Sequence, residues 1–95
     1  HLLELVKGAG APARVELKGA EVVLGRGEKA DILVDSEEVS RQHARFVRLD
    51  EEYQVEDQES RNGVYLNGLK VHLALLREGD ELQLGDLVYV YREGF

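Results

Sequence analysis

The 95-residue sequence contains no cysteine, methionine, tryptophan or threonine, and its only proline is Pro12. Without cysteine, the chain cannot form a disulfide framework, a thiolate metal site or a thiol nucleophile. Its histidines, His1, His43 and His72, are scattered without the spacing of metal ligands. We expect neither a metal nor another cofactor.

Long apolar runs are also missing. No stretch approaches the roughly 20 apolar residues that span a bilayer, and no signal-peptide pattern opens the chain. These absences predict a cytoplasmic protein with no membrane insertion. The length suits one domain over residues 1–95. Because the first residue is His1 rather than Met, we expect this domain to be excised from a longer protein.

The charge is acidic overall, with a formal net value of −7. This balance argues against nucleic-acid binding, which needs a basic surface. The cations nevertheless gather in or beside a few loops described below: Arg26, Lys29, Arg41, Arg45, Arg61 and Lys70.

Alternation of apolar and polar residues with period two recurs along the chain and predicts short, half-buried strands. The predicted strands lie at 2–6, 14–18, 21–24, 31–34, 44–49, 52–56, 64–66, 81–84 and 87–91. Gly8–Ala13 has the composition of a hairpin loop. Only Leu73–Arg77 suggests a helical turn. Many short strands separated by turn signals predict an all-β sandwich or barrel.

Four loop segments combine turn residues with groups that bind anions. Gly25-Arg26-Gly27 follows an apolar run; alone, it is more simply a tight strand exit with a solvated arginine. In a binding site, the planar guanidinium of Arg26 would hold a phosphate through two bonds.

Ser40-Arg41-Gln42-His43 precedes a strand, and its structural interpretation is a serine turn that enters the strand, with His43 as an ordinary hydrogen-bonded histidine. In a binding site, Ser40 and Arg41 would donate to phosphate, while His43 would brace the loop through its ring nitrogens. Ser60-Arg61-Asn62-Gly63 and Asn67-Gly68 contain both asparagines of the chain. Asn-Gly is a strong hairpin signal, but an exposed Asn also suits pairing with a peptide main chain.

The segments form an ordered pattern: Gly25-Arg26, Ser40-x-x-His43, Asp57-x-x-Ser60-x-Asn62-Gly63, Leu66-Asn67-Gly68 and Leu82-x-Leu84-Gly85. This pattern resembles the signature of forkhead-associated (FHA) domains over residues 22 to 90. No single element is specific, whereas the combination is.

The resemblance implies a two-sheet β-sandwich of about eleven mostly antiparallel strands, with the binding loops at one end. It implies a module that binds phosphothreonine peptides in Ser/Thr kinase signalling and catalyses no reaction. Phosphate contacts would come from Arg26, Ser40, Arg41 and Arg61. Asn62, assisted by Asn67, would hold the peptide backbone. The implied supporting residues are Gly25, His43 and Gly63.

Since these 95 residues contain no threonine, a phosphothreonine ligand must lie outside them. We expect it in trans, on another protein or peptide; a threonine-bearing tail that flanks the domain in cis is the alternative. One alternative is a phosphate-independent interaction scaffold of the same fold that uses a sheet face or edge, with Tyr89 or Tyr91 as outward apolar residues. Another is a hydrolase built on Ser40 or Ser60 with His43. The sequence has no nucleophile elbow or evident oxyanion hole, which argues against the hydrolase.

Overall fold

The computed structural model describes residues 1–93, which form eleven strands in two sheets. The six-stranded sheet has the order β2-β1-β11-β10-β7-β8. Its strands are β1 (Leu2–Lys7), β2 (Arg14–Glu16), β7 (Val64–Leu66), β8 (Leu69–Val71), β10 (Glu81–Leu84) and β11 (Leu87–Arg92). The described residues contain no helix, and hence none long and apolar enough to cross a membrane.

The five-stranded sheet has the order β4-β3-β5-β6-β9. Its strands are β3 (Glu21–Gly25), β4 (Ile32–Leu33), β5 (Ala44–Leu49), β6 (Glu52–Asp57) and β9 (Leu73–Leu75). All strand pairs are antiparallel except β3 with β4. The predicted sandwich of about eleven mostly antiparallel strands is therefore confirmed.

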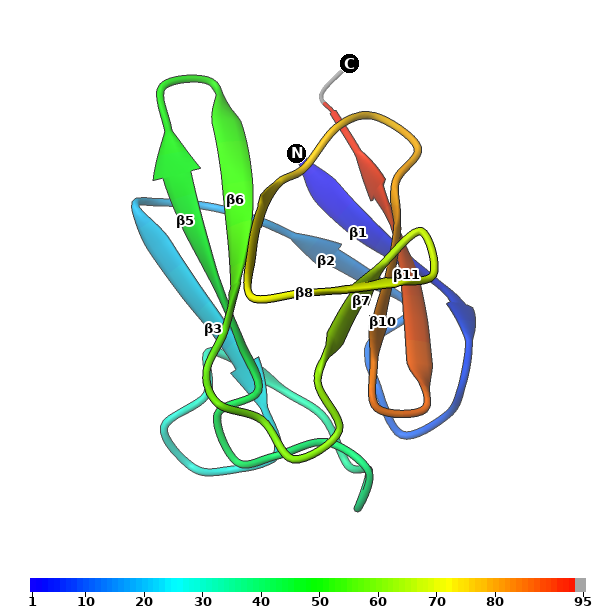
Figure 1. Ribbon diagram of the computed structural model, residues 1–95. Coiled ribbons are helices and arrows are strands. Elements are labelled where there is room, and N and C mark those ends of the chain that lie inside the picture. The colour runs from blue at the N-terminus through cyan, green and yellow to red at the C-terminus, as the bar shows by residue number, and fades with distance from the viewer. Residues whose placement is uncertain (94–95) are drawn as a thin grey trace.

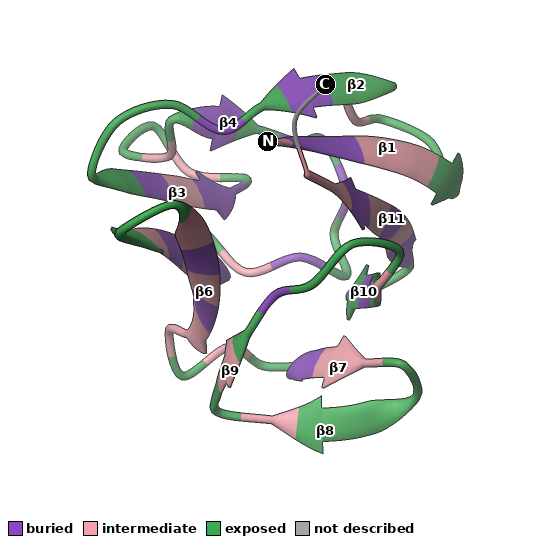
Figure 2. Cartoon of the chain, turned by 90° about the horizontal axis from the view of Figure 1, so that it is seen from above, coloured by how far each residue is buried: buried purple, intermediate pink, exposed green. Residues whose placement is uncertain are grey.

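Side-chain alternation places the core between the sheets (Figure 2). Tyr53 and Val55 of β6 are buried, as are Leu82 and Leu84 of β10, while their neighbours along each strand are more exposed. These residues join one apolar cluster shared by both sheets. Its burial provides the main favourable free energy for a rigid scaffold.

Two sequence-based interpretations are corrected by the structure. Leu73–Arg77 does not form a helical turn, because Leu73–Leu75 pairs as strand β9 with β6. Tyr89 and Tyr91 do not face outward, because both are fully buried on the inner face of β11. The Tyr89 hydroxyl donates to the carbonyl oxygen of Pro12 at 2.8 Å, which satisfies its polar group inside the sandwich.

The loops between β3 and β4, between β4 and β5, and between β6 and β7 gather at one end of the sandwich (Figure 1). The first two segments belong to the five-stranded sheet, and the third crosses from that sheet to the other. These loops contain most of the candidate site residues. Both described ends of the chain lie toward the opposite end in the same view.

Candidate functional site

The first loop is held against the second by its backbone. The Arg26 amide donates to the Ser40 carbonyl oxygen at 3.1 Å, and the Gly27 amide donates to the Arg41 carbonyl oxygen at 3.0 Å. A Cβ atom added to Gly25 would lie 2.0 Å from that Arg41 oxygen. Glycine at 25 is thus required by the close approach of two backbones, without any need for a positive φ.

The Arg26 side chain is exposed but fixed at one point. Its Nε donates to the Val39 carbonyl oxygen at 2.8 Å. Its two terminal nitrogens make no hydrogen bond to any residue in the described part of the chain. The guanidinium is therefore oriented by the protein while retaining donors for a ligand.

The Ser40 hydroxyl lies between the second and third loops. Its oxygen accepts a hydrogen bond from the Arg61 amide at 3.0 Å. Within residues 1–93, the hydroxyl proton is donated to no protein acceptor. A hydroxyl that accepts one bond and keeps its proton free can donate to an anion above it.

His43 is fully buried and joins the same two loops. Its Nδ1 accepts from the Ser40 amide at 3.0 Å, which places the ring proton on Nε2, and Nε2 donates to the Gly63 carbonyl oxygen at 2.7 Å. Burial lowers the pKa of His43 below its usual value. A neutral ring with both nitrogens bonded to backbone groups is not available as a base for the Ser40 hydroxyl.

The third loop is braced by the side chains of Ser60 and Asp57. The Ser60 hydroxyl donates to the Asp57 carboxylate and accepts from the Gly63 amide at 3.0 Å. Gly63 has φ of +82°, a conformation that favours glycine. Ser60 is thus engaged in shaping the turn that presents Asn62.

Asn62 reaches back to the second loop. Its Nδ2 donates to the Glu38 carbonyl oxygen at 2.7 Å and lies 3.1 Å from the Glu38 carboxylate. Its Oδ1 accepts no hydrogen bond from any residue in the described part of the chain. Glu38 was missed by the sequence analysis, because a main-chain acceptor 24 positions away leaves no signal in residue type.

The candidate ligand-binding residues are hydrogen-bonded to three consecutive residues, Glu38, Val39 and Ser40. Asn62 bonds to Glu38, the Arg26 guanidinium bonds to Val39, and the Arg61 amide bonds to Ser40. The structure brings these groups to one short segment, although they are up to 36 positions apart in the sequence (Arg26 to Asn62).

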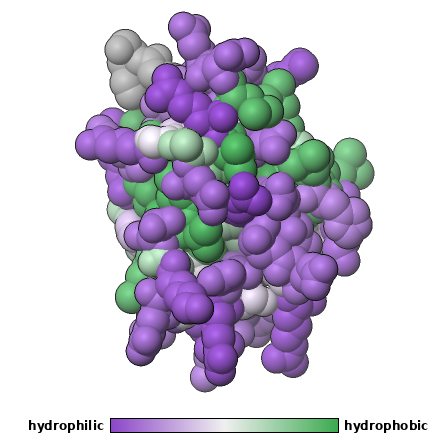
Figure 3. Space-filling view, turned by 90° about the vertical axis from the view of Figure 1, so that its left-hand side faces the viewer, coloured by the Kyte–Doolittle hydropathy of each residue, from purple (hydrophilic) through white to green (hydrophobic). Residues whose placement is uncertain are grey.

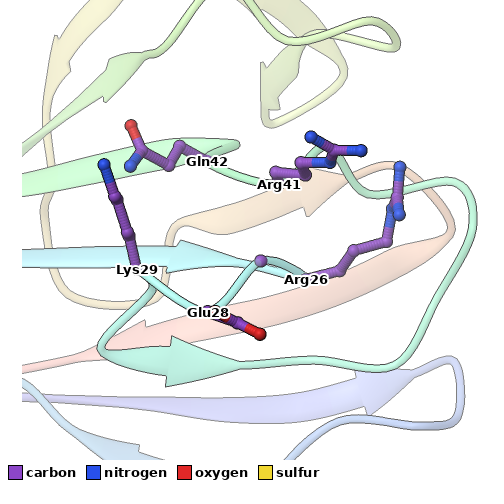
Figure 4. Close-up of a pocket in the computed structure, with 6 residues that line it drawn as sticks. Arg26, Glu28, Lys29, Arg41 and Gln42 are labelled. Atoms are coloured by element: carbon purple, nitrogen blue, oxygen red, sulfur yellow. The ribbon is translucent and has the colours of Figure 1, made fainter.

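Arg26 and Arg41 also line one pocket of about 660 Å³ together with Gly27, Glu28, Lys29 and Gln42. Figure 4 shows the guanidinium groups of Arg26 and Arg41 extending toward the same side, while the Glu28 carboxylate points elsewhere. The Arg61 side chain is exposed and is not part of that lining. In Figure 3, hydrophilic side chains dominate the end of the molecule where these loops lie.

Asn67 lies apart from this cluster, at the other end of β7. Its Nδ2 donates to the Asp80 carboxylate at 3.0 Å, and its Oδ1 accepts from the Glu81 amide at 2.9 Å. With φ of +50°, it forms a two-residue hairpin turn with Gly68. Both polar ends of the side chain thus hold the β7–β8 hairpin against the start of β10.

The fold and the loop geometry define a class: a β-sandwich whose loops at one end present hydrogen-bond donors that the described residues leave unused. Comparison with known families identifies it further, because the family profile described as FHA domain matches residues 22–85. The chain belongs to the FHA domain family.

Similar proteins include regulators from actinobacteria. The chain is 38% identical over 93 residues to an oxoglutarate dehydrogenase inhibitor of Corynebacterium diphtheriae, covering 98% of this chain and 65% of that protein. It is 39% identical over 93 residues to the glycogen accumulation regulator GarA of Mycobacterium tuberculosis, covering 98% of this chain and 57% of the regulator. The chain thus spans about three fifths of the length of these relatives.

Among solved structures, the fold is similar to that of an FHA domain from a structural and functional analysis of phosphothreonine-dependent FHA domain interactions. The TM-score is 0.88 at 26% identity, and the alignment covers 99% of this chain and 96% of the other.

Proposed function

We propose that this domain binds phosphothreonine-containing segments of other proteins and acts as a recognition module in cytoplasmic Ser/Thr kinase signalling. The observation on which the proposal depends is the convergence on residues 38–40. Asn62 bonds to Glu38, the Arg26 side chain bonds to Val39, and the backbone amide of Arg61 bonds to the Ser40 hydroxyl. The solved FHA domain similar in fold belongs to a study of phosphothreonine-dependent interactions, which supports the same ligand class.

The arrangement suits a phosphate dianion. A phosphothreonine has about −1.5 to −2 charges near neutral pH and three acceptor oxygens. The terminal nitrogens of Arg26 and the Ser40 hydroxyl supply donors, and Arg41 and Arg61 supply further positive charge. A hydrogen bond to a charged group contributes roughly 1.5–3 kcal/mol. Loss of two such bonds would weaken binding by about two to four orders of magnitude.

Asn62 has a different role in the proposal. Because its Nδ2 is held by Glu38, its free Oδ1 has a fixed direction. That oxygen can accept the main-chain N–H of an extended peptide next to the phosphothreonine. Asn67 is left out of the ligand contacts because both ends of its amide bond to the start of β10.

Selection of threonine over serine needs a contact beyond the phosphate. A single methyl group in an apolar pocket contributes about 0.8 kcal/mol by transfer, which is roughly a fourfold preference. A larger preference requires that the stiff, β-branched side chain also fixes the position of the phosphate. We expect a threonine preference of at least this size.

A binding role also fits the chemistry better than hydrolysis. His43 cannot take the Ser40 proton, because its ring is neutral and both ring nitrogens are hydrogen-bonded to backbone groups. The Ser60 hydroxyl is hydrogen-bonded to Asp57. We therefore propose that the domain recognises its ligand without turning it over. Hydrolysis of a generic ester that Ser40→Ala abolished would contradict this.

The decisive experiment is calorimetric titration of matched peptides that contain phosphothreonine, phosphoserine or unmodified threonine. The expected order of affinity is phosphothreonine, then phosphoserine, with the plain peptide scarcely bound. An oriented phosphothreonine peptide library then defines the preferred flanking residues. Equal affinity for phosphorylated and plain peptides would refute the proposal.

Phosphate-independent contact through a sheet face or edge is a second candidate. The edge strand β9 exposes Leu73 and Leu75, and Figure 3 shows apolar side chains interspersed with polar ones above the loop end. A partner bound in this way would be retained equally by the wild type and Arg26→Ala. The matched peptides and this variant together distinguish the two candidates.

A further inference from the structure

The pocket beside Arg26 is lined by more residues than those assigned to the phosphate of the phosphothreonine. Besides Arg26, Gly27 and Arg41, it is lined by Glu28, Lys29 and Gln42, so it has three cations against one carboxylate, and neither Ser40 nor Asn62 lines it. Figure 4 shows Lys29 and Gln42 together at one end of the pocket and the two guanidinium groups at the other. The lining therefore includes a cation and an amide displaced from the proposed phosphate position.

These cations are gathered in one place within an acidic chain. The sequence has 19 Asp and Glu against 12 Lys and Arg, so a basic side chain has many acidic neighbours available. Lys18, Arg45 and Arg92 each form an ion pair with glutamate. Most of the other cations, Arg26, Lys29 and Arg41 among them, form no ion pair with any residue between 1 and 93, but these three also lie together in one pocket lining that has a single carboxylate. The pocket thus concentrates positive charge that the described part of the protein does not neutralise.

The groove on the other side of the site has the opposite charge. It is lined by Asn62 together with Glu38, Tyr65, Gly68, Gln83, Gly85 and Asp86. Glu38 and Asp86 are the only ionisable carboxylates in that lining, and it contains no cation. The two proposed ligand-binding residues therefore each border a different flank: Arg26 borders the basic one and Asn62 borders the acidic one.

We propose that the basic pocket binds a second anionic group of the same ligand, a carboxylate or a second phosphate, located on one flank of the phosphothreonine only. Lys29 is the main residue that selects this group, because it is the cation of the pocket that is not assigned to the phosphothreonine. This inference rests on the proposed function and specifies its ligand: a phosphothreonine segment that is acidic on one side.

The net charge of the domain and the cations of the pocket act in opposite directions on an acidic residue of the peptide. A domain with net charge −7 repels additional negative charge on a peptide. An added acidic residue therefore raises affinity only where a local group of cations outweighs that repulsion. On the flank next to Glu38 and Asp86, the same residue meets like charge and weakens binding.

The test starts from a phosphothreonine peptide with uncharged flanks. Glutamate is placed singly at each of the three positions before and after the phosphothreonine, and phosphoserine then replaces glutamate at the best position. Each peptide is titrated by calorimetry into the wild type, Lys29→Gln and Arg77→Gln. Arg77 is an exposed residue in the hollow lined by His1, Arg48 and Glu78, so its substitution removes the same charge outside the basic pocket.

We expect glutamate to raise affinity about three- to tenfold at positions on one flank only, and phosphoserine to raise it further. Lys29→Gln should abolish this gain while leaving affinity for the parent peptide within about twofold, and Arg77→Gln should preserve the gain. Higher affinity with phosphoserine than with glutamate would identify a second phosphate as the preferred group. The reverse order would identify a carboxylate.

The inference is overturned if no glutamate raises affinity, if both flanks give equal gains, or if the gain persists in Lys29→Gln. These results leave the proposed function standing as long as the parent phosphothreonine peptide binds. If the parent peptide itself fails to bind the wild type, the proposed function is refuted and the inference falls with it.

Discussion

The ring of His43 is hydrogen-bonded to Gly63, with Nε2 lying 2.7 Å from the carbonyl oxygen. The other ring nitrogen accepts the Ser40 amide, so one buried side chain links the loop that contains Ser40 to the loop that contains Asn62. Both bonds require the neutral ring with its proton on Nε2. The relative position of these two loops consequently depends on the protonation state of a residue that contacts no ligand in the proposal.

Acidification should destabilise the domain through this residue. Burial lowers the pKa of His43 in the folded state below its ordinary value of about 6.5. The unfolded chain therefore binds a proton first as pH falls, and stability decreases from pH near 6.5 down to the lowered folded pKa. One such group gives a slope of at most about 1.4 kcal/mol per pH unit. The free energy of unfolding, measured by denaturant between pH 7.5 and 5, checks this expectation.

The variants His43→Gln and His72→Gln separate this effect from other titrations. His43→Gln should lower stability at pH 7.5 by about 1–3 kcal/mol, because buried partners lose their bonds, and it should flatten the pH dependence. His72 is exposed, so His72→Gln should keep the wild-type slope. An equal loss of stability between pH 7 and 5 in the wild type and His43→Gln would contradict the assignment.

Arg26→Ala and Ser40→Ala should each weaken phosphopeptide binding by about one to two orders of magnitude while leaving the fold intact, because each removes about 1.5–3 kcal/mol of charge-assisted bonding. Arg26→Lys should recover little of the loss. A lysine cannot bond to the Val39 carbonyl oxygen and also present two further coplanar donors. Calorimetry on variants with unchanged circular dichroism checks these values. Near-wild-type affinity of a folded variant would remove that residue from the site.

The sequence predicted the scaffold well because strands such as β6, β10 and β11 alternate between core and surface. The predicted ranges 44–49, 64–66 and 81–84 match β5, β7 and β10 in full, and the remaining predicted strands differ only at their ends. Strands β8 and β9 were missed. Their residues are mostly exposed at sheet edges, so Leu69 and Leu73 give no alternation between buried and exposed positions.

Within the site, the sequence motifs indicated which residues belong to the loops, but they did not indicate the hydrogen-bond partner of each side chain. Asn62 and Asn67 occur in the same Asn-Gly context, and the structure separates them by their partners. Asn62 bonds to Glu38, whereas Asn67 bonds to Asp80 and Glu81. Such partners are distant in sequence and are brought close only by the packing of the two sheets.

Gly25→Ala should destabilise the domain by more than about 2 kcal/mol and weaken peptide binding. The new methyl group would lie 2.0 Å from the Arg41 carbonyl oxygen, which forces apart the two loops that contain Arg26 and Ser40. Gly79→Ala is the matched control, since nothing lies within 4 Å of its added Cβ, its cost comes only from φ of +86°, and it lines neither flank of the site. We expect that cost to be about 1 kcal/mol, with affinity unchanged. A Gly25→Ala variant with wild-type stability would show that the close contact can relax.

Replacement of the two asparagines should separate ligand binding from hairpin stability. Asn62→Ala should weaken phosphopeptide binding about three- to tenfold, the loss expected for one neutral hydrogen bond. The ratio of affinities for phosphorylated and plain peptides should stay nearly constant, because Asn62 contacts the peptide backbone in the proposal.

Asn67→Ala should show the reverse behaviour. It removes two hydrogen bonds to the start of β10 and places alanine at φ of +50°, which should lower the free energy of unfolding by about 1–3 kcal/mol. Peptide affinity should remain within twofold of the wild type at a temperature where both proteins are folded. If Asn67→Ala weakened binding as much as Asn62→Ala, the second asparagine would contact the ligand, and its bonds to Asp80 and Glu81 would have to open when the peptide binds.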